Sequence, residues 1–131
     1  MITRKEWAKG LCYEPVFGWF AFYPNGTSDP SLAAVEGPMA QFITSITYSA
    51  VGGYVIQFSS DFVFAGTPQF VLTPSFDGLT NYYAVAIDGA YSQTTRQLTV
   101  RAHRAGTGQA VAASANAKIA VALLVSDSGG K

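Results

Sequence analysis

The chain is poor in the side chains that carry out chemistry. It contains one cysteine, Cys12, and one histidine, His103, among 131 residues. A single cysteine cannot form an internal disulfide framework, and one cysteine with one histidine cannot complete a structural zinc centre within the chain. Covalent catalysis needs a nucleophile, a base and an orienting group within reach of one another, and no nucleophile-elbow pattern accompanies His103. We therefore expect a protein that is not an enzyme and that holds no cofactor or metal.

Net charge is absent as well. Eight Lys and Arg residues balance eight Asp and Glu residues, so no long-range attraction draws the chain to nucleic acid or to an anionic membrane surface. The longest uninterrupted apolar run, residues 119–125, is far shorter than the roughly 18 residues needed to cross a membrane. No secretory leader is recognised at the start of the sequence. These features predict no nucleic-acid partner, no membrane insertion, and folding in a reducing cytoplasm.

What the sequence does contain is a β pattern. From residue 42 to residue 125, short segments that alternate apolar and polar residues are separated by Gly, Pro, Asp and Ser. This pattern predicts an all-β fold, a compact antiparallel β-sandwich that is jelly-roll-like or lectin-like, with about six to eight strands. We place the sandwich domain at residues 41–126. An extended N-terminal anchoring arm is expected at residues 1–40, and a short polar tail at residues 127–131.

Individual strands follow from the alternation. The strongest hairpin signal joins residues 42–48 to residues 54–58, because both segments alternate and a Gly-Gly pair lies between them. In the last predicted strand, Ala120, Ala122 and Leu124 face away from the other apolar residues. A strand that is apolar on both faces is central in its sheet or lies against a neighbour, and small alanines would let another subunit approach closely. The remaining strands are expected at residues 69–73, 82–88, 94–102 and 118–126.

The first forty residues carry a dense aromatic cluster. Residues 13–24 hold six aromatic side chains between and beside Pro15 and Pro24. Two interpretations stay open: the cluster is one more strand covering the core of the same domain, or it is an arm lying across a neighbouring subunit or a larger scaffold. A short helix is expected within residues 3–9 from its capping-box spacing. The candidate anchor residues are Trp7, Phe17, Trp19, Phe20 and Phe22.

A small basic group is the second candidate site. Arg101 and His103 share one face of a predicted strand if the alternation holds. One interpretation pairs this group with Asp88 or Asp61 across a subunit contact. The other is contact with a carbohydrate, in which exposed tyrosines serve as stacking platforms. The candidate residues for a glycan or subunit contact are Tyr82, Tyr83, Tyr91, Arg101 and His103.

The order of these segments resembles a known group of proteins. The segments 53–58 (GYVIQF), 68–73 (PQFVLT) and 119–123 (IAVAL) resemble the small trimeric β-sandwich modules of bacteriophage tail fibres, head fibres and capsid decoration proteins. The spacing of apolar and aromatic residues in these segments is also similar to that of H-type lectins. The resemblance covers residues 42–126. The chain lacks the coiled-coil heptads or shaft repeats of long fibres, which suits a capsid decoration or a small fibre subunit better than a complete tail fibre.

The resemblance implies a function. It implies a non-enzymatic virion structural protein, assembled in the host cytoplasm as a homotrimer and carried on the virion. Its partners would be further copies of the chain, other capsid or tail proteins and, where it serves host attachment, a host-surface glycan. The alternative is a lectin-like carbohydrate-binding adhesin module.

Overall fold

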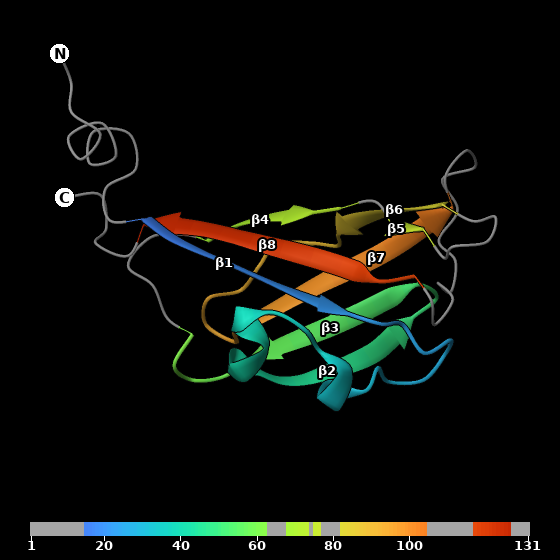
Figure 1. The fold of residues 1–131 in the computed structure, drawn as a ribbon, viewed down its shortest axis with the longest axis horizontal. Helices are drawn as coiled ribbons and strands as arrows, with labels where there is room; N and C mark the ends of the chain where they lie inside the picture. The colour runs from blue at the N-terminus through green and yellow to red at the C-terminus, as the bar shows by residue number, and fades with distance from the viewer. Residues whose placement is uncertain (1–14, 63–67, 74, 77–81, 105–116, 127–131) are drawn as a thin grey trace, which may run out of the picture.

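A computed structural model describes residues 15–62, 68–73, 75–76, 82–104 and 117–126. They form two antiparallel sheets, a small sheet with strand order β1-β8-β4 and a large sheet with strand order β2-β3-β7-β6-β5 (Figure 1). The predicted all-β sandwich is therefore confirmed. The strands are β1 (Pro15–Phe22), β2 (Ile43–Ala50), β3 (Gly53–Phe58), β4 (Gln69–Leu72), β5 (Ser75–Phe76), β6 (Tyr82–Ile87), β7 (Gln97–Arg104) and β8 (Ile119–Ser126).

The predicted hairpin is present. Strands β2 and β3 pair antiparallel with Ile46 opposite Ile56. Between them, Gly52 has a φ of 71°, in the left-handed region that glycine enters without steric cost. The alternation of β3 points Tyr54, Ile56 and Phe58 into the core, where each is at most 1% exposed. Local sequence pattern thus determines both the turn and the buried face of this hairpin.

Strand β7 begins later than predicted, at Gln97 rather than at residue 94. The preceding residue, Arg96, has a φ of 56°, which ends the extended conformation on its N-terminal side. Ser92 and Gln97 close this turn by donating their backbone N–H groups to each other's carbonyls, at 3.2 and 3.3 Å. The inward side chains expected from the alternation are buried, namely Leu98 and Val100.

Strand β1 corrects the predicted domain boundary. Residues 15–22 do not form an arm separate from the sandwich, because β1 pairs antiparallel with β8 over its whole length, from Pro15 opposite Ser126 to Phe22 opposite Ile119. Figure 1 shows the blue β1 lying alongside the red β8. The sandwich therefore begins at residue 15 within the described chain, and the interpretation of the aromatic cluster as one more strand holds. Residues 1–14 and the tail at 127–131 lie outside the described residues.

The segment between β1 and β2, which was predicted to lie mostly in the N-terminal arm, is also part of the fold. It contains two short 3-10 helices, η1 (Leu32–Ala34) and η2 (Pro38–Phe42). Met39 of η2 is 4% exposed and belongs to the core. Glu36 bridges to Ala21 of β1 through two backbone hydrogen bonds of 3.0 and 2.9 Å. This segment therefore covers part of the free edge of β1.

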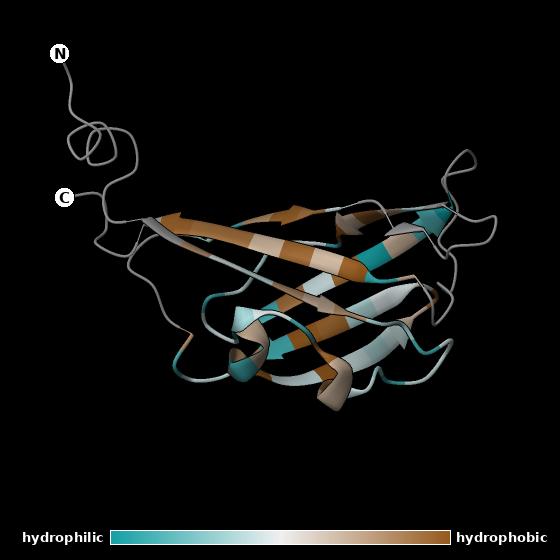
Figure 2. Cartoon of the chain, viewed as in Figure 1, coloured by the Kyte–Doolittle hydropathy of each residue, from teal (hydrophilic) through white to brown (hydrophobic). Residues whose placement is uncertain are grey.

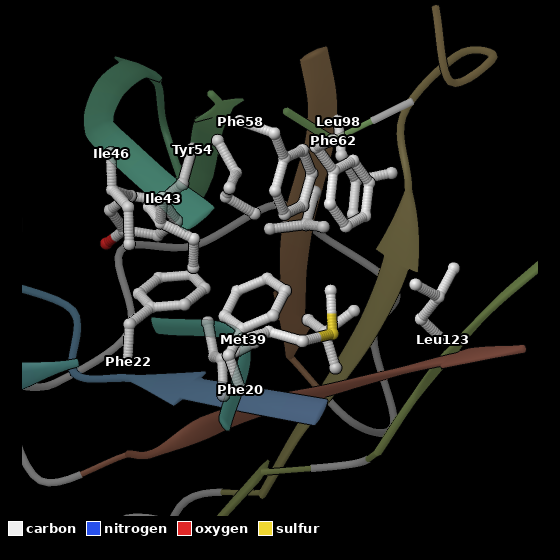
Figure 3. Close-up of a cluster of buried hydrophobic side chains, with 14 of the residues drawn as sticks. Phe20, Phe22, Met39, Ile43, Ile46, Tyr54, Phe58, Phe62, Leu98 and Leu123 are labelled. Carbon is white, nitrogen blue, oxygen red and sulfur yellow. The ribbon is translucent and has the colours of Figure 1, made fainter. Parts of the chain in front are cut away.

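The core between the sheets is strongly aromatic (Figure 3). Phe58 stacks on Phe62 with ring centroids 4.1 Å apart and meets the edge of Phe20 at 5.9 Å. Phe22 meets Tyr54 edge to face at 5.5 Å. Burial raises the pKa of Tyr54 to about 12. Side chains from both sheets thus meet in one cluster, which explains why the two layers fold as a unit.

A cluster of three polar side chains joins the segment after β1 to the start of β8. We call it the polar clasp and define it by Tyr23, Glu36 and Lys118. The ammonium of Lys118 lies 2.8 Å from a carboxylate oxygen of Glu36, and the hydroxyl of Tyr23 donates to the other oxygen at 3.1 Å. The bond from Lys118, followed by that from Tyr23, lowers the pKa of Glu36 below its ordinary value of 4.5. The bond to Glu36 raises the pKa of Lys118 above 10.5. The clasp is therefore fully charged around neutral pH.

This clasp predicts a pH dependence of stability. Because the pKa of Glu36 is lowered in the folded chain, its contribution is present above about pH 5 and is lost as the pH falls through the folded pKa. Because the pKa of Lys118 is raised, its contribution is present below about pH 10 and is lost as the pH rises through the folded pKa. The thermal midpoint of Glu36→Gln should therefore lie slightly below that of the native chain at neutral pH. The difference should be small, because both groups are exposed.

The measurement is a series of thermal melts of both chains across this pH range. The two midpoints should converge in acid, where Glu36 is protonated, and in added salt, which screens exposed pairs. A difference that persists unchanged at about pH 2 would contradict the ion-pair explanation.

Candidate functional site

The outer face of the small sheet is the candidate functional site. Its outward side chains include Phe17, Val71, Leu124 and Trp19, which are 73%, 62%, 44% and 43% exposed. They belong to three different strands that lie side by side in the order β1, β8, β4. We call this surface the apolar face, and define it by Phe17, Trp19, Val71, Ala120, Ala122 and Leu124.

The strand register makes the apolar face continuous. Trp19 lies opposite Ala122, which in turn lies opposite Val71, so these three side chains form one row across the sheet. Phe17 lies opposite Leu124 in the neighbouring row. Strands β8 and β4 are coloured as hydrophobic over most of their length in Figure 2. The sequence predicted that Ala122 and Leu124 face away from the core, but it did not identify Val71 as part of the same surface.

The outer face of the large sheet is different in character. Gln97 donates to the side-chain oxygen of Gln57 at 2.9 Å, and Gln57 donates to the carbonyl of Thr95 at 2.7 Å. Arg101 pairs with Asp88 at 2.8 Å. These polar side chains pair with one another or with the backbone and are compatible with contact with water. One outer face of the sandwich is therefore polar and the other is apolar.

The apolar face is large enough to matter energetically. A Phe or Trp side chain buries about 150–250 Å², so the exposed fractions of Phe17 and Trp19 alone correspond to roughly 200 Å². With Val71 and Leu124 added, the patch is on the order of 400 Å², within the range of the largest patches on soluble monomers, which are often functional. Removing such a surface from water is favourable, since burial contributes about 25 cal/mol per Å². The face is therefore suited to contact with another apolar surface.

The predicted anchor residues divide between the two sides of β1. Phe17 and Trp19 point outward and belong to the apolar face. Phe20 and Phe22 are each 0% exposed and lie in the core, so the prediction that they are anchor contacts is wrong. The reason is the two-residue period of a strand, which places alternate side chains on opposite faces. Trp7 lies outside the described residues.

Two of the predicted glycan residues, Tyr83 and Tyr91, are used in packing rather than in an exposed stacking platform. Tyr83 is only 5% exposed and packs with Ala102 and Ala117, so its expected role as an exposed platform is wrong. Tyr91 packs against Phe70 at 5.1 Å and Phe58 at 6.3 Å, and burial raises its pKa. Both tyrosines therefore support the fold. The side chain of Tyr82 lies outside the described part of the structure.

The basic group behaves partly as expected. Arg101 and His103 do share a face, because β7 alternates and its even-numbered inward positions are buried. Arg101 pairs with Asp88, which was one of its two expected partners, but the pair forms within one chain rather than across a subunit contact. The guanidinium of Arg101 is therefore already engaged, which leaves it less suited to bind an anionic sugar.

Within the described ranges, no pocket is found, and no group of three or more His, Cys, Asp and Glu side chains is arranged to hold a metal ion. Among the same residues, no helix has the length and apolar character needed to cross a membrane. Comparisons with protein-family models, with curated proteins and with solved structures find no match for this chain.

Proposed function

We propose that this protein is a non-enzymatic structural subunit of a virion that binds other proteins through the apolar face. A capsid decoration protein, a head-fibre subunit or a short tail-fibre subunit would each use such a surface. The observation that carries the proposal is the grouping of Phe17, Trp19, Val71 and Leu124 on one outer face of the sandwich, opposite a polar one. In this proposal, the apolar face of the small sheet contacts protein, and the polar outer face of the large sheet stays in contact with water.

The anchor in this proposal differs from the arm expected from the sequence. Phe17 and Trp19 lie on a strand with eight paired positions, so their positions are set by the sheet before any partner binds. Rigid presentation of aromatic side chains lowers the entropy lost on binding. The polar face of the large sheet would then be displayed at the particle surface. The protein would be assembled in the host cytoplasm and carried on the virion.

The proposal is tested on particles. Virus particles produced from the genome that encodes this chain are purified on a density gradient and analysed by quantitative mass spectrometry. We expect the chain to be present at a fixed number of copies per particle. Phe17→Ser should reduce incorporation by about tenfold or more, which corresponds to roughly 1.4 kcal/mol of binding energy. The matched control is Thr47→Ala, which changes an exposed residue of the large sheet.

Two results would count against the proposal. The chain could be missing from purified particles, or it could be incorporated equally well with and without Phe17. Circular dichroism of both variants shows whether either substitution acts by unfolding the chain. A glycan array should give no signal, because Tyr83 and Tyr91 are engaged in packing. Specific glycan binding would instead favour the lectin-like alternative.

A further inference from the structure

We infer that Asn25 is a site of spontaneous deamidation, and that its conversion to aspartate or isoaspartate weakens the contact between the turn at residues 25–29 and the edge strand β2. Asn25 and Gly26 lie just beyond the end of β1 and belong to an exposed turn. The inference is independent of the proposed function, because it concerns the chemistry of one side chain and not the partner of the apolar face.

The turn that carries Asn25 is anchored on both sides and open to water. The Ser28 N–H donates to the Asn25 carbonyl at 2.9 Å, so residues 25–28 form a β-turn. The flanking residues Pro24 and Pro30 are buried, whereas residues 25–29 are all exposed. Water can therefore reach the Asn25 side chain, as hydrolysis requires.

Gly26 supplies the nucleophile for this reaction. Its backbone nitrogen must reach Cγ of Asn25, and a glycine at this position has no side chain to hinder the approach. Gly26 has a φ of 58°, and a Cβ built on it would meet nothing within 4 Å. Within the described ranges, no backbone hydrogen bond from the Gly26 N–H is found. The attack is therefore opposed neither by neighbouring atoms nor by the loss of a backbone hydrogen bond.

The reaction needs only water. The nitrogen of Gly26 gives up its proton and bonds to Cγ of Asn25, while the bond between Cγ and Nδ2 breaks. The side-chain nitrogen leaves as ammonia and carries that proton away. One water then opens the cyclic imide at either of its carbonyls. Opening at Cγ gives aspartate, and opening at the main-chain carbonyl gives isoaspartate, in which the chain runs through Cγ. Nothing is oxidised or reduced.

The sequence favours Asn25 over the other residues that could react in this way. The other two asparagines, at positions 81 and 116, precede residues that carry a side chain. Asp88 also precedes a glycine, but a carboxylate is a poorer electrophile than an amide, and this one is paired with Arg101 at 2.8 Å. Asn25 is therefore expected to react first.

Deamidation would act on the edge of the large sheet through Asp29. The side-chain amide of Asn25 donates to the carbonyl of Asp29 at 3.4 Å, and the carboxylate of Asp29 accepts the Tyr48 N–H at 2.8 Å. Because β2 is an edge strand, Asp29 occupies a backbone donor that a further strand could otherwise bind (Figure 1). A carboxylate at position 25 cannot donate to that carbonyl, and it adds a negative charge near Asp29. Isoaspartate would also lengthen the backbone of the turn.

The first experiment follows Asn25 in the purified full chain during long incubation in neutral buffer made with heavy-oxygen water. Peptide mapping by mass spectrometry should show a labelled carboxyl group at position 25 before any change at positions 81 and 116. The rate in the folded chain should lie within about tenfold of the rate in guanidinium chloride. The matched control Asn25→Gln should stay unmodified, because its amide would have to close a larger ring. Conversion in the unfolded chain but not in the folded one would overturn the inference.

The second experiment measures the effect on β2 by hydrogen exchange. Asn25→Asp reproduces one product of the reaction, and Asn25→Gln keeps a neutral amide. Exchange at the Tyr48 amide should be about threefold to tenfold faster in Asn25→Asp than in the native chain, the loss expected for one hydrogen bond. It should change less in Asn25→Gln. The Ile56 amide in β3 should exchange equally in all three chains, which excludes a general loss of stability. Unchanged exchange at Tyr48 in Asn25→Asp would contradict the link between this turn and the edge strand.

Discussion

Replacing Phe20 with alanine is expected to destabilise the fold by about 3–5 kcal/mol, the usual cost of removing a buried aromatic side chain. Phe20 is 0% exposed, and its ring meets the edge of Phe58 at 5.9 Å and stacks near Phe22 at 6.5 Å. The substitution leaves a cavity between the two sheets. Since small domains have a total stability of about 5–15 kcal/mol, this loss would remove much of it.

The same strand supplies the matched control. Phe17 is 73% exposed on the opposite face of β1, so Phe17→Ala should change the stability of the monomer by no more than about 0.5 kcal/mol. Both free energies are measured by urea denaturation at the same protein concentration. The two substitutions remove the same atoms from one strand, and therefore differ only in the face they affect.

This comparison tests the corrected domain boundary. If residues 15–22 were an arm outside the sandwich, neither substitution would change the denaturation midpoint by much. Equal effects of Phe20→Ala and Phe17→Ala would contradict the assignment of β1 to the small sheet. A large effect of Phe20→Ala alone would support it. The comparison of these two substitutions is also a control for the particle experiment, since it shows whether Phe17 can be changed without unfolding the chain.

Gly37→Ala is expected to destabilise the chain by about 3 kcal/mol, for two separate reasons. Gly37 has a φ of 100°, which residues with a Cβ atom rarely adopt. A Cβ placed there would lie 2.6 Å from the carbonyl oxygen of Trp19 and 2.9 Å from its ring. The backbone at residues 36–37 would have to move away from β1, which would break the two hydrogen bonds between Glu36 and Ala21.

The variant Gly89→Ala separates the cost of backbone strain from the cost of the close contact with Trp19. Gly89 has a similar φ of 88°, but a Cβ there would meet nothing within 4 Å. It should therefore cost only the backbone strain, about 1–2 kcal/mol. Urea denaturation of both variants gives the difference, which reports the close approach of residue 37 to β1. Equal losses would show that the segment after η1 is not packed against the strand as described.

Gly37 also links the fold to the apolar face. Because its neighbours are the backbone and ring of Trp19, a displaced residue 37 would move that side chain on the apolar face. Gly37→Ala should then reduce incorporation into particles more than its loss of stability explains. The position of Trp19 on the apolar face is thus set in part by a segment that was predicted to lie in the N-terminal arm.

The sequence was most informative where the structure is local. The hairpin of β2 and β3 was predictable because a Gly-Gly pair and two alternating segments lie next to each other in the chain. The burial of Leu98 and Val100 was predictable because the polar residues beside them identify the solvent-facing side. Similarly, the apolar character of both sides of β8 indicated a central strand, as it is in the small sheet. In these cases neighbouring residues carry all of the necessary information.

For residues 15–22, the alternation of the sequence did not predict which face is buried. Both alternating sets contain aromatic side chains, Phe17 and Trp19 in one and Phe20 and Phe22 in the other, so the two-residue period did not indicate which set faces inward. Likewise, the sequence suggested exposed tyrosines, but Tyr83 packs against Ala117, which follows much later in the chain.

The amino-acid sequence by itself thus determined an all-β chain, the positions of most strands and the scarcity of reactive groups. The tertiary structure decided that β1 pairs with β8 and that β8 pairs with β4. That pairing selected Phe20 and Phe22 for the core and brought Phe17, Trp19, Val71 and Leu124 onto one surface. The physical reason is that alternation specifies which side chains share a face, whereas only contact between strands distant in sequence specifies which face is covered.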